Sequence, residues 1–396
     1  MSVLEIAIKA KEASLKLQGF SEEMRLTALD AISKALLTHK EEILIENRKD
    51  LEEAEKNKLS SAMLDRLTLT SKSITDLSAM CTSVANQKQV MGMITESHTR
   101  PDGLIIQKQR IPLGVIGMIF ESRPNVVVDG SALAIKSGNA IILKGGKEAQ
   151  YSNRKLFEII NEATSSVLPE GSISLIETRE DVAEMLKLDK YIDLMVPRGG
   201  STLIQYVKQH ATMPVVAHDK GLCHLYVHED CSVDAAAIVV NAKVQRPGVC
   251  NALETLILNE KYPHNEAILK ALKDCGVEIK HPATEEDYST EWLDKKISLK
   301  FVKNSNEAIE HIKKYSSHHT EAILAQDQTV IEEFLNALDA SCIAINASTR
   351  FNDGGELGLG AELGISTSKL HAYGPMGASE MTTTRFIVTG QGHIRK

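Results

Sequence analysis

The sequence lacks several patterns that would assign it to common classes of protein. Its six cysteines form no C-x-x-C pair and no Cys/His spacing suited to zinc, which argues against a metal site. Scattered cysteines of this kind favour a reducing, cytoplasmic setting. No apolar run approaches the roughly 18 residues that span a bilayer, and residues 1–17 lack the apolar core of a signal peptide. We therefore expect a soluble protein with no membrane segment.

The chain also has no excess of basic residues, since its formal net charge is −8. A nucleic-acid-binding protein normally shows a basic face, so we expect no nucleic-acid partner. The chain has no internal repeat and no low-complexity segment. Its 396 residues, 43% of them hydrophobic, are enough for two or three domains that each have a core.

The hydrophobic pattern divides the chain into three kinds of segment. Residues 1–95 show apolar positions three and four apart, which predicts consecutive helices. From Ile111, and again from about Ala235, short apolar runs alternate with helical patterns, which indicates parallel strands joined by crossover helices. Two such units would leave a cleft, and ligands of open α/β sheets bind beyond the carboxyl ends of the strands. The strand-like segments 103–108 and 383–389 fit neither unit and suggest a protruding ribbon that makes an oligomer contact.

The segment 245–252, Gln-Arg-Pro-Gly-Val-Cys-Asn-Ala, carries the clearest chemical signal. It places Cys250 after a Pro-Gly turn, near Arg246, and just before the strand-like run 253–258. A neighbouring cation and backbone N–H groups lower a thiol pKa of about 8.5 toward neutrality. Free cysteines are more often small buried hydrophobic residues, and the other five have that character. Cys250 is therefore the candidate nucleophile.

Four arginines occur in turn-like contexts: Arg123, Arg198, Arg246 and Arg350. A guanidinium group matches the oxygens of a carboxylate or phosphate, so arginines that converge from loops would suit a substrate with several negative charges. The alternative for each one is an exposed arginine paired with a local acid.

Two other segments have the composition of ligand-binding loops. Asn125 opens the helix predicted over 126–136, where its amide is either an oxyanion donor or an ordinary N-cap. Lys144, Gly145, Gly146 and Lys147 follow the strand predicted over 140–143, where glycine lets the backbone approach a ligand and lysine attracts phosphate. No G-x-G-x-x-G follows a predicted strand, so a dinucleotide would have to be held in another way.

Four ordered segments together resemble one family. They are 119–126, 245–255, 319–323 and 358–367, and they resemble the γ-glutamyl phosphate reductases, also called glutamate-5-semialdehyde dehydrogenases, of proline biosynthesis. The resemblance covers essentially the whole chain. These enzymes belong to the aldehyde dehydrogenase superfamily. The resemblance implies an α/β fold with two parallel-sheet domains, a cleft between them and a small β oligomerisation ribbon. The expected boundaries are 1–97 and 111–228 for the cofactor domain, 229–382 for the catalytic domain, and 98–110 and 383–396 for the ribbon.

The resemblance also implies roles for individual residues. Cys250 matches the nucleophile, and Asn125 matches the side chain that stabilises the oxyanion together with the Cys250 N–H. The cofactor residues are Lys144 for the adenosine ribose, Gly199, Gly200 and Ser201 for the pyrophosphate, and Glu291 for the nicotinamide ribose. Lys147 stands where NAD-preferring relatives tend to have an acid, which favours NADPH. The substrate-binding set comprises Arg123, Arg198, Arg246, Arg350 and His319.

The implied reaction is attack of Cys250 on γ-glutamyl phosphate, loss of phosphate, and reduction of the resulting thioester to glutamate 5-semialdehyde. Ala217 matches the position of the glutamate that activates water in hydrolytic relatives, so hydrolysis is disfavoured. The roles of His218 and Asp219 stay open. The alternatives are a hydrolytic NAD(P)-dependent aldehyde dehydrogenase and a non-catalytic metabolite-binding relative. Expected partners are further copies of the chain, as a dimer or tetramer, and in transient association a separate glutamate 5-kinase.

Overall fold

The computed structural model describes residues 1–217 and 220–395, and the chain forms two compact units. The first unit comprises Met1–Val216, Gly358–Gly364 and Met376–Lys396, and the second comprises Ala217–Leu357 and Ile365–Pro375. The boundary after Val216 precedes the one expected after residue 228. It does so because β7 (Cys223–Val227) pairs with two strands of the second unit's sheet.

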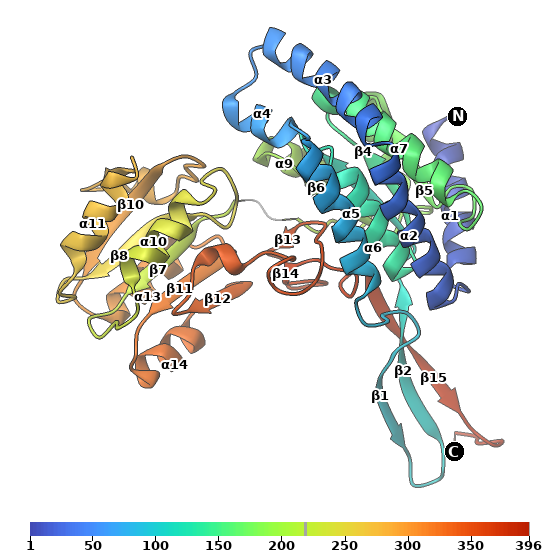
Figure 1. The fold of residues 1–396 in the computed structure, drawn as a ribbon. Helices are drawn as coiled ribbons and strands as arrows, with labels where there is room; N and C mark the ends of the chain where they lie inside the picture. The colour runs from blue at the N-terminus through green and yellow to red at the C-terminus, as the bar shows by residue number, and fades with distance from the viewer. Residues whose placement is uncertain (218–219, 396) are drawn as a thin grey trace. The chain divides into compact units, whose positions relative to one another are not determined.

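The first unit begins with the expected run of helices (Figure 1). Their bounds are α1 (Val3–Leu17), α2 (Glu22–Thr38), α3 (Lys40–Lys56), α4 (Ser61–Leu67) and α5 (Ser71–Ala85). Ser2, Ser21 and Thr70 start helices α1, α2 and α5 by accepting a hydrogen bond from an amide of the first turn. α2 packs against α5 and α7, and α1 packs against β4. No helix in the described part of the chain is long and apolar enough to cross a membrane.

A four-stranded parallel sheet with the order β5-β4-β3-β6 forms the centre of the first unit. Its strands are β3 (Val115–Phe120), β4 (Ala140–Lys144), β5 (Ile173–Ile176) and β6 (Leu194–Arg198). The helical elements between and after them are α6 (Val126–Ser137), η1 (Lys147–Ala149), α7 (Gln150–Thr164), α8 (Arg179–Met185) and α9 (Ser201–His210). The strand order reverses between β3 and β6. Ligands of open α/β sheets bind at the carboxyl ends of strands at such a reversal.

The second unit contains a six-stranded parallel sheet with the order β12-β11-β7-β8-β10-β9. Its other strands are β8 (Leu253–Asn259), β9 (Glu278–Lys280), β10 (Lys296–Val302), β11 (Thr320–Leu324) and β12 (Cys342–Ile345). The helical elements are α10 (Ala235–Val244), α11 (Asn265–Asp274), α12 (Glu285–Tyr288), α13 (Ser305–Tyr315), α14 (Gln328–Ala337) and η2 (Thr349–Phe351). A short antiparallel pair, β13 (Ile365–Ser366) and β14 (Gly374–Pro375), completes the unit.

Side chains of β8 alternate between two hydrophobic cores, as a strand buried on both faces requires. Leu256 and Leu258 join the core formed with α10 and α11, whereas Ile257 joins the core formed with α13 and α14. The alternation of strands and helices read from the sequence is thus confirmed for both units.

An antiparallel ribbon of three strands extends from the first unit (Figure 1). Its strands are β1 (Ile94–Thr99), β2 (Ile105–Pro112) and β15 (Thr382–Thr389), and β2 pairs with both others. Two of these strands were expected from composition, whereas β1 begins before the expected start of the ribbon at residue 98. Phe386 and Val388 of β15 are 66% and 58% exposed, so the ribbon presents apolar side chains to the outside.

Candidate active site

The loop after β3 is held in shape by a carboxylate from the loop after β4. Ser122 has a positive φ of 44°, which is uncommon for a residue with a side chain. Glu148 Oε1 accepts hydrogen bonds from both the amide and the hydroxyl of Ser122, each at 2.6 Å. These two bonds stabilise the turn that leads into Arg123, Pro124 and Asn125.

Asn125 opens α6, but its side chain does not cap the helix. Its Nδ2 atom instead donates a hydrogen bond of 2.8 Å to Asp129 Oδ2, one helical turn further on. Burial raises the pKa of Asp129 to about 6, and Arg198, the Asn125 amide and Arg123 act in the opposite direction. Of the two alternatives for Asn125, the ordinary N-cap is therefore excluded, and its amide is oriented by a carboxylate that the sequence analysis overlooked. The spacing of four residues, which puts both side chains on one helix face, was the available signal.

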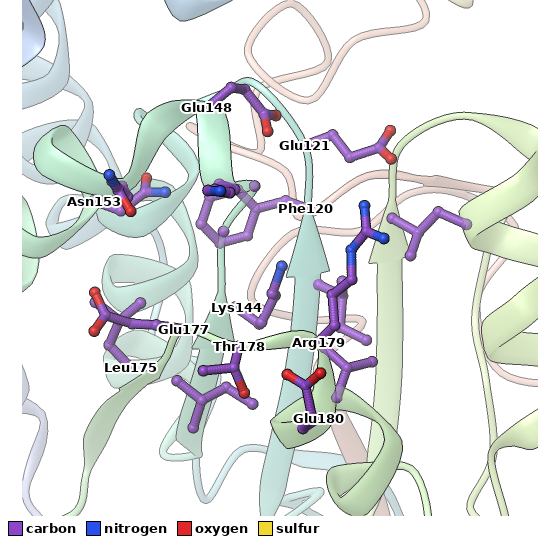
Figure 2. Close-up of a pocket in the computed structure, with 18 of the residues that line it drawn as sticks. Phe120, Glu121, Lys144, Glu148, Asn153, Leu175, Glu177, Thr178, Arg179 and Glu180 are labelled. Atoms are coloured by element: carbon purple, nitrogen blue, oxygen red, sulfur yellow. The ribbon is translucent and has the colours of Figure 1, made fainter. Parts of the chain in front are cut away.

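A pocket of about 1100 Å³ lies at the carboxyl ends of the first sheet's strands (Figure 2). Its lining includes Lys144, Gly145 and Lys147 after β4, Glu121 after β3, and Arg179 after β5. Burial lowers the pKa of Lys144; Glu148 opposes this shift and Arg179 adds to it. Gly145 lets the chain pass close to α7, because a Cβ there would lie 2.0 Å from Asn153 Nδ2.

The expected pyrophosphate loop, Gly199 to Ser201, joins β6 to α9. Thr202 and Leu203, which follow this loop in the first turn of α9, line the same pocket. The Gly200 amide donates a 2.8 Å hydrogen bond to Glu121 Oε2. A Cβ on Gly199 would come within 2.3 Å of the same oxygen, so a side chain there would displace the Glu121 carboxylate. A negatively charged group therefore already contacts the start of α9, which is a favourable position for an anion.

The two arginines Arg123 and Arg198, in the loop after β3 and at the end of β6, both interact electrostatically with Asp129. Both act on its pKa, Arg198 more strongly than Arg123. Arg198 also donates from Nη1 to the Glu362 carbonyl at 3.2 Å, and its Nη2 lies 3.6 Å from Glu362 Oε1. The structure thus groups Arg123, Arg198, Asn125 and Asp129 at the ends of β3 and β6.

Cys250 lies in a turn immediately before β8, and its side chain is half-buried. Its carbonyl oxygen accepts a hydrogen bond of 3.2 Å from the thiol of Cys223, at the start of β7. Burial raises the pKa of Cys223 well above its ordinary value, so that thiol stays protonated. Of these two neighbouring cysteines, only Cys250 is suited to act as a nucleophile.

Three of the expected substrate-binding residues lie around Cys250 in the second unit. Arg350 donates from Nε to Gln245 Oε1 at 3.1 Å. Its pKa is lowered mainly by burial. Asp353 and Cys250 raise this pKa and Arg246 lowers it, so Arg350 lies within electrostatic reach of all three groups. His319 is fully buried, with Nδ1 2.7 Å from Thr320 Oγ1 and 3.8 Å from Cys223 Sγ.

Buried side-chain bonds hold the two segments that carry Cys250 and Arg350 against each other. Asn251 Nδ2 donates to the Asn352 carbonyl at 3.0 Å, and Thr349 Oγ1 donates to the Asn251 carbonyl at 2.7 Å. Asn352 in turn donates to Thr320 Oγ1 at 2.8 Å, next to His319. This network fixes three candidate residues that are far apart in the sequence.

The remaining expected residues behave differently from one another. Glu291 Oε1 accepts a 2.9 Å hydrogen bond from the Gly221 amide. Ala217 is buried, at 7% exposure. His218 and Asp219 lie outside the described residues. Within residues 1–217 and 220–395, no group of three or more His, Cys, Asp or Glu side chains is arranged to hold a metal ion.

The second sheet departs from the expectation that ligands bind at the carboxyl ends of strands. Cys250 precedes β8, Cys223 begins β7 and His319 precedes β11, so the candidate residues of this unit lie at the amino ends. The hydrophobic pattern located the strands correctly, but it does not encode which end of a sheet carries a site.

Comparison with known proteins decides the family. The sequence model of the aldehyde dehydrogenase family matches residues 3–287, which is more than half of the chain. The chain belongs to the aldehyde dehydrogenase family. A γ-glutamyl phosphate reductase from Carboxydothermus hydrogenoformans is 47% identical, and the alignment covers 99% of both chains. The family that the four sequence segments resemble is thereby confirmed, and the chain is an oxidoreductase.

Solved structures agree with this membership. A γ-glutamyl phosphate reductase from Thermotoga maritima has a TM-score of 0.95 and 42% identity, with 100% of each chain covered. An engineered glycolyl-CoA reductase with bound NADP⁺ has a TM-score of 0.75 at 16% identity, with 98% of this chain and 96% of that chain covered, which establishes a shared fold. The expected fold class, two parallel sheets and a small antiparallel ribbon, is confirmed.

Proposed function

We propose that this chain catalyses the NADPH-dependent reduction of γ-glutamyl phosphate to glutamate 5-semialdehyde with release of phosphate, the second step of proline biosynthesis from glutamate. The observation that carries this proposal is the full-length similarity, in both sequence and fold, to γ-glutamyl phosphate reductases. The arrangement of residues around Cys250 is consistent with the chemistry.

The proposed nucleophile is the thiolate of Cys250. It attacks the acyl carbonyl of the substrate, the bond from carbon to the phosphate oxygen breaks, and phosphate leaves while a thioester forms on Cys250. Arg350, which interacts electrostatically with Cys250, and Arg246, four residues before Cys250 in the sequence, would favour the thiolate and the anionic groups of the substrate. His319 lies next to Cys223 and would help to shape the surroundings of Cys250.

Asn125 is the proposed donor to the oxyanion that develops during attack, together with the Cys250 N–H. The hydrogen bond from Nδ2 to Asp129 fixes the rotation of the Asn125 amide. A donor held in advance contributes more to transition-state stabilisation than one that must be ordered during the reaction. Arg123 and Arg198, close to Asp129, are proposed to bind anionic groups of the substrate.

The pocket of the first unit is the proposed NADPH site, and the cofactor when bound supplies the hydride that reduces the thioester. Lys144 is proposed to bind the adenosine ribose, and Gly199, Gly200 and Ser201 the pyrophosphate. Three of the nearby carboxylates already have partners: Glu148 on Ser122, Glu121 on Gly200 and Glu177 on Arg154. Lys147 and Arg179 are exposed in this pocket, which favours a cofactor that carries a 2′-phosphate.

Ala217 supports reduction over hydrolysis of the thioester. An alanine side chain cannot remove a proton from water, so a thioester at this site would persist until hydride transfer. Glu291 is proposed, from the family resemblance, to contact the nicotinamide ribose.

The proposed setting is the cytoplasm, which agrees with six cysteines that are all free thiols. The apolar side chains exposed on the ribbon support its proposed role in a homodimer or homotetramer. The acyl phosphate would come from a separate glutamate 5-kinase, and a transient association with that enzyme would limit loss of this reactive substrate to water.

The test is reduction of NADP⁺ by the purified protein supplied with the semialdehyde and its cyclised pyrroline form, with and without inorganic phosphate. Activity that requires both phosphate and Cys250, judged with Cys250→Ala, supports the proposal. Activity without phosphate identifies water as the acceptor and favours a hydrolytic aldehyde dehydrogenase. If the wild-type protein binds NADPH but reduces no NADP⁺ either with or without phosphate, a non-catalytic relative is favoured.

A further inference from the structure

Gly221 packs directly on the backbone of Cys250. A Cβ at residue 221 would lie 2.0 Å from the Cys250 carbonyl oxygen, 2.7 Å from its carbonyl carbon and 2.8 Å from its Cα. All three distances are far below van der Waals contact. The chain can therefore pass Cys250 this closely only because residue 221 is glycine.

A carboxylate holds Gly221 in this position. The Gly221 amide donates a hydrogen bond of 2.9 Å to Glu291 Oε1. The two segments are 70 residues apart in the sequence, so this bond ties together parts of the second unit that no local structure would join. Glu291 thus acts on the backbone that contacts Cys250.

The segment that carries Glu291 is itself anchored by a buried ion pair. Glu254 accepts hydrogen bonds from the amides of Trp292 at 3.2 Å and Leu293 at 3.3 Å. Leu293 has a positive φ of 50°, which these bonds help to stabilise. Glu254 also pairs with Lys243 Nζ at 3.0 Å, and both side chains are almost completely buried. The carboxylate of Glu291 therefore projects from a fixed support.

We propose that Glu291 is a positioning residue for Cys250, and that it acts through Gly221 before any cofactor binds. The family resemblance assigns Glu291 only to the nicotinamide ribose. In this structure its carboxylate has a partner within the chain, one step removed from the nucleophile. The inference rests on the proposed function in one respect, the role of Cys250 as nucleophile.

The mechanism of positioning is steric. Gly221 packs against the Cys250 carbonyl, which also accepts a hydrogen bond from the Cys223 thiol. Loss of the Glu291 carboxylate releases Gly221, and the turn that carries Cys250 gains freedom to move away from Arg350. A thiol that moves away from a cation is less often a thiolate at neutral pH, and it reacts more slowly with electrophiles.

The experiment measures alkylation of Cys250 by iodoacetamide in the full-length protein, without NADPH or substrate. The modified peptide is followed by mass spectrometry, because the chain has six free cysteines. In Glu291→Ala we expect the rate at pH 7 to fall by about fivefold or more, with the alkylation profile moved to higher pH. Glu291→Gln keeps an oxygen that accepts from Gly221 and should restore much of the rate. Glu286→Gln, an exposed glutamate in α12, is the matched control.

A role confined to the ribose predicts a different result: Glu291→Ala would raise the KM for NADPH and leave cofactor-free alkylation unchanged. Alkylation within about twofold of wild type, or faster than wild type, overturns the proposal. Gly221→Ala tests the other side of the same contact, since its methyl group would displace the Cys250 backbone, and slower alkylation is expected there too. It keeps the proposal testable if Glu291→Ala does not fold.

The two levels of inference can fail separately. Full activity in Cys250→Ala would remove the proposed function, whatever the alkylation rates are. An inactive Cys250→Ala combined with wild-type alkylation in Glu291→Ala would remove only the positioning role.

Discussion

The first sheet carries its candidate residues at the carboxyl ends of its strands, whereas the second sheet carries them at the amino ends. In the first unit, Lys144 and Arg198 are the last residues of β4 and β6, and the loop to Asn125 follows β3. In the second unit, Cys250 and His319 precede β8 and β11. Both sheets are parallel and both have a reversal of strand order, so topology alone does not decide which end of a sheet binds a ligand.

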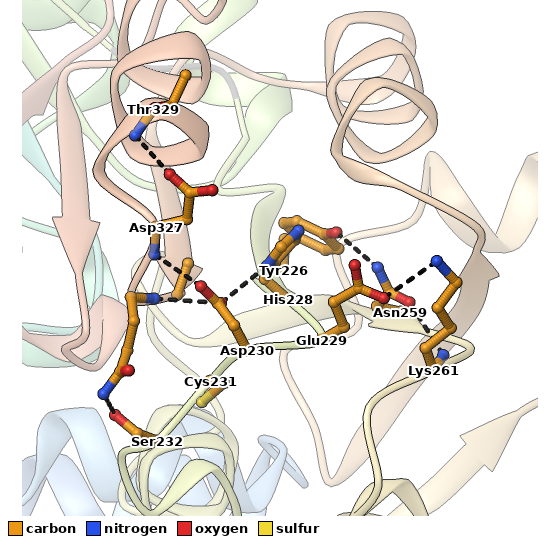
Figure 3. Close-up of polar contacts among 12 residues, drawn as sticks. Tyr226, His228, Glu229, Asp230, Cys231, Ser232, Asn259, Lys261, Asp327 and Thr329 are labelled. Atoms are coloured by element: carbon orange, nitrogen blue, oxygen red, sulfur yellow. Dashed lines mark hydrogen bonds and ion pairs between the residues drawn. The ribbon is translucent and has the colours of Figure 1, made fainter.

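The reversal in the second sheet lies between β7 and β11, and polar contacts link the loops at its carboxyl end (Figure 3). Asp230 accepts hydrogen bonds from His228 Nδ1 at 2.8 Å, from the Gln326 amide at 3.2 Å and from the Asp327 amide at 2.7 Å. These bonds tie the loop after β7 to the loop after β11. In the first unit, the Glu121 carboxylate also links two loops by its hydrogen bond with the Gly200 amide. There, however, Glu121 lines a pocket. A reversal of strand order thus provides diverging loops, and side chains decide whether a ligand can enter.

The largest expected effect is on kcat, and it should distinguish two cysteines at opposite ends of the second sheet. Cys250 lies at the amino end and Cys231 at the carboxyl end, and both are half-buried. We expect Cys250→Ala to lower kcat by roughly 10⁴-fold or more, because the covalent route is lost. Cys231→Ala should keep kcat near the wild-type value. Phosphate-dependent reduction of NADP⁺ measures both, and comparable losses in the two variants would contradict the assignment of the site to the amino end.

The next effect concerns Asp129 in the first unit. Asp129→Leu removes the acceptor for the Asn125 amide, and we expect kcat to fall by about 10- to 100-fold, less than the full loss of an oxyanion donor. The pKa of Asp129 is raised to about 6, so its carboxylate is protonated below that pH and accepts more weakly. The kcat of the wild type should therefore decline as pH falls through about 6. Asp129→Asn keeps an acceptor that does not titrate, so this acidic limb should disappear.

The outcome at Asp129 also separates positioning from simple stability. A purely structural role would lower the melting temperature of Asp129→Leu without a selective loss of kcat. Asn125→Ala is the reference: if its kcat is unchanged, the oxyanion role fails, and the effect at Asp129 needs another explanation.

Much of this arrangement could be predicted from the sequence, because the predictable parts depend on local pattern. Alternating apolar runs located the strands, and the turn before residues 253–258 identified Cys250. The ends of the sheets could not be assigned, since strand order depends on contacts between distant segments, such as β7 with β11. The N-cap interpretation of Asn125 failed for a related reason: side-chain partners on a helix face compete with capping, and the structure selects Asp129.

A smaller effect is expected from charge reversal in the pocket of the first unit. Lys147→Glu places a carboxylate where a 2′-phosphate is proposed to bind. We expect kcat/KM for NADPH to fall by about tenfold while kcat/KM for NADH changes little. Lys187→Glu, an exposed lysine that does not line the pocket, controls for net charge. Equal losses with both cofactors would show that Lys147 does not select the phosphate.

The smallest effect on activity is expected at the carboxyl end of the second sheet, where Asp230 links two loops. Asp230→Ala removes the acceptor of three hydrogen bonds and should lower the free energy of unfolding by about 1 to 3 kcal/mol, with kcat/KM nearly unchanged. Asp274→Ala, which removes an exposed partner of Lys270, is the control and should have a smaller effect.

The difference in stability between wild type and Asp230→Ala should depend on pH, because the Asp230 carboxylate titrates. Burial tends to raise the pKa of Asp230, but the hydrogen bonds from His228, Gln326 and Asp327 outweigh it, and the pKa is lowered from its ordinary value of 3.8. A group with a lowered folded-state pKa contributes its stabilisation above the unfolded pKa and loses it as pH falls through the folded one. The gap in melting temperature between wild type and Asp230→Ala should therefore be full at neutral pH and narrow below about pH 4. If Asp230→Ala instead lowers kcat/KM at unchanged stability, the carboxyl end of this sheet takes part in function, and the contrast between the two sheets disappears.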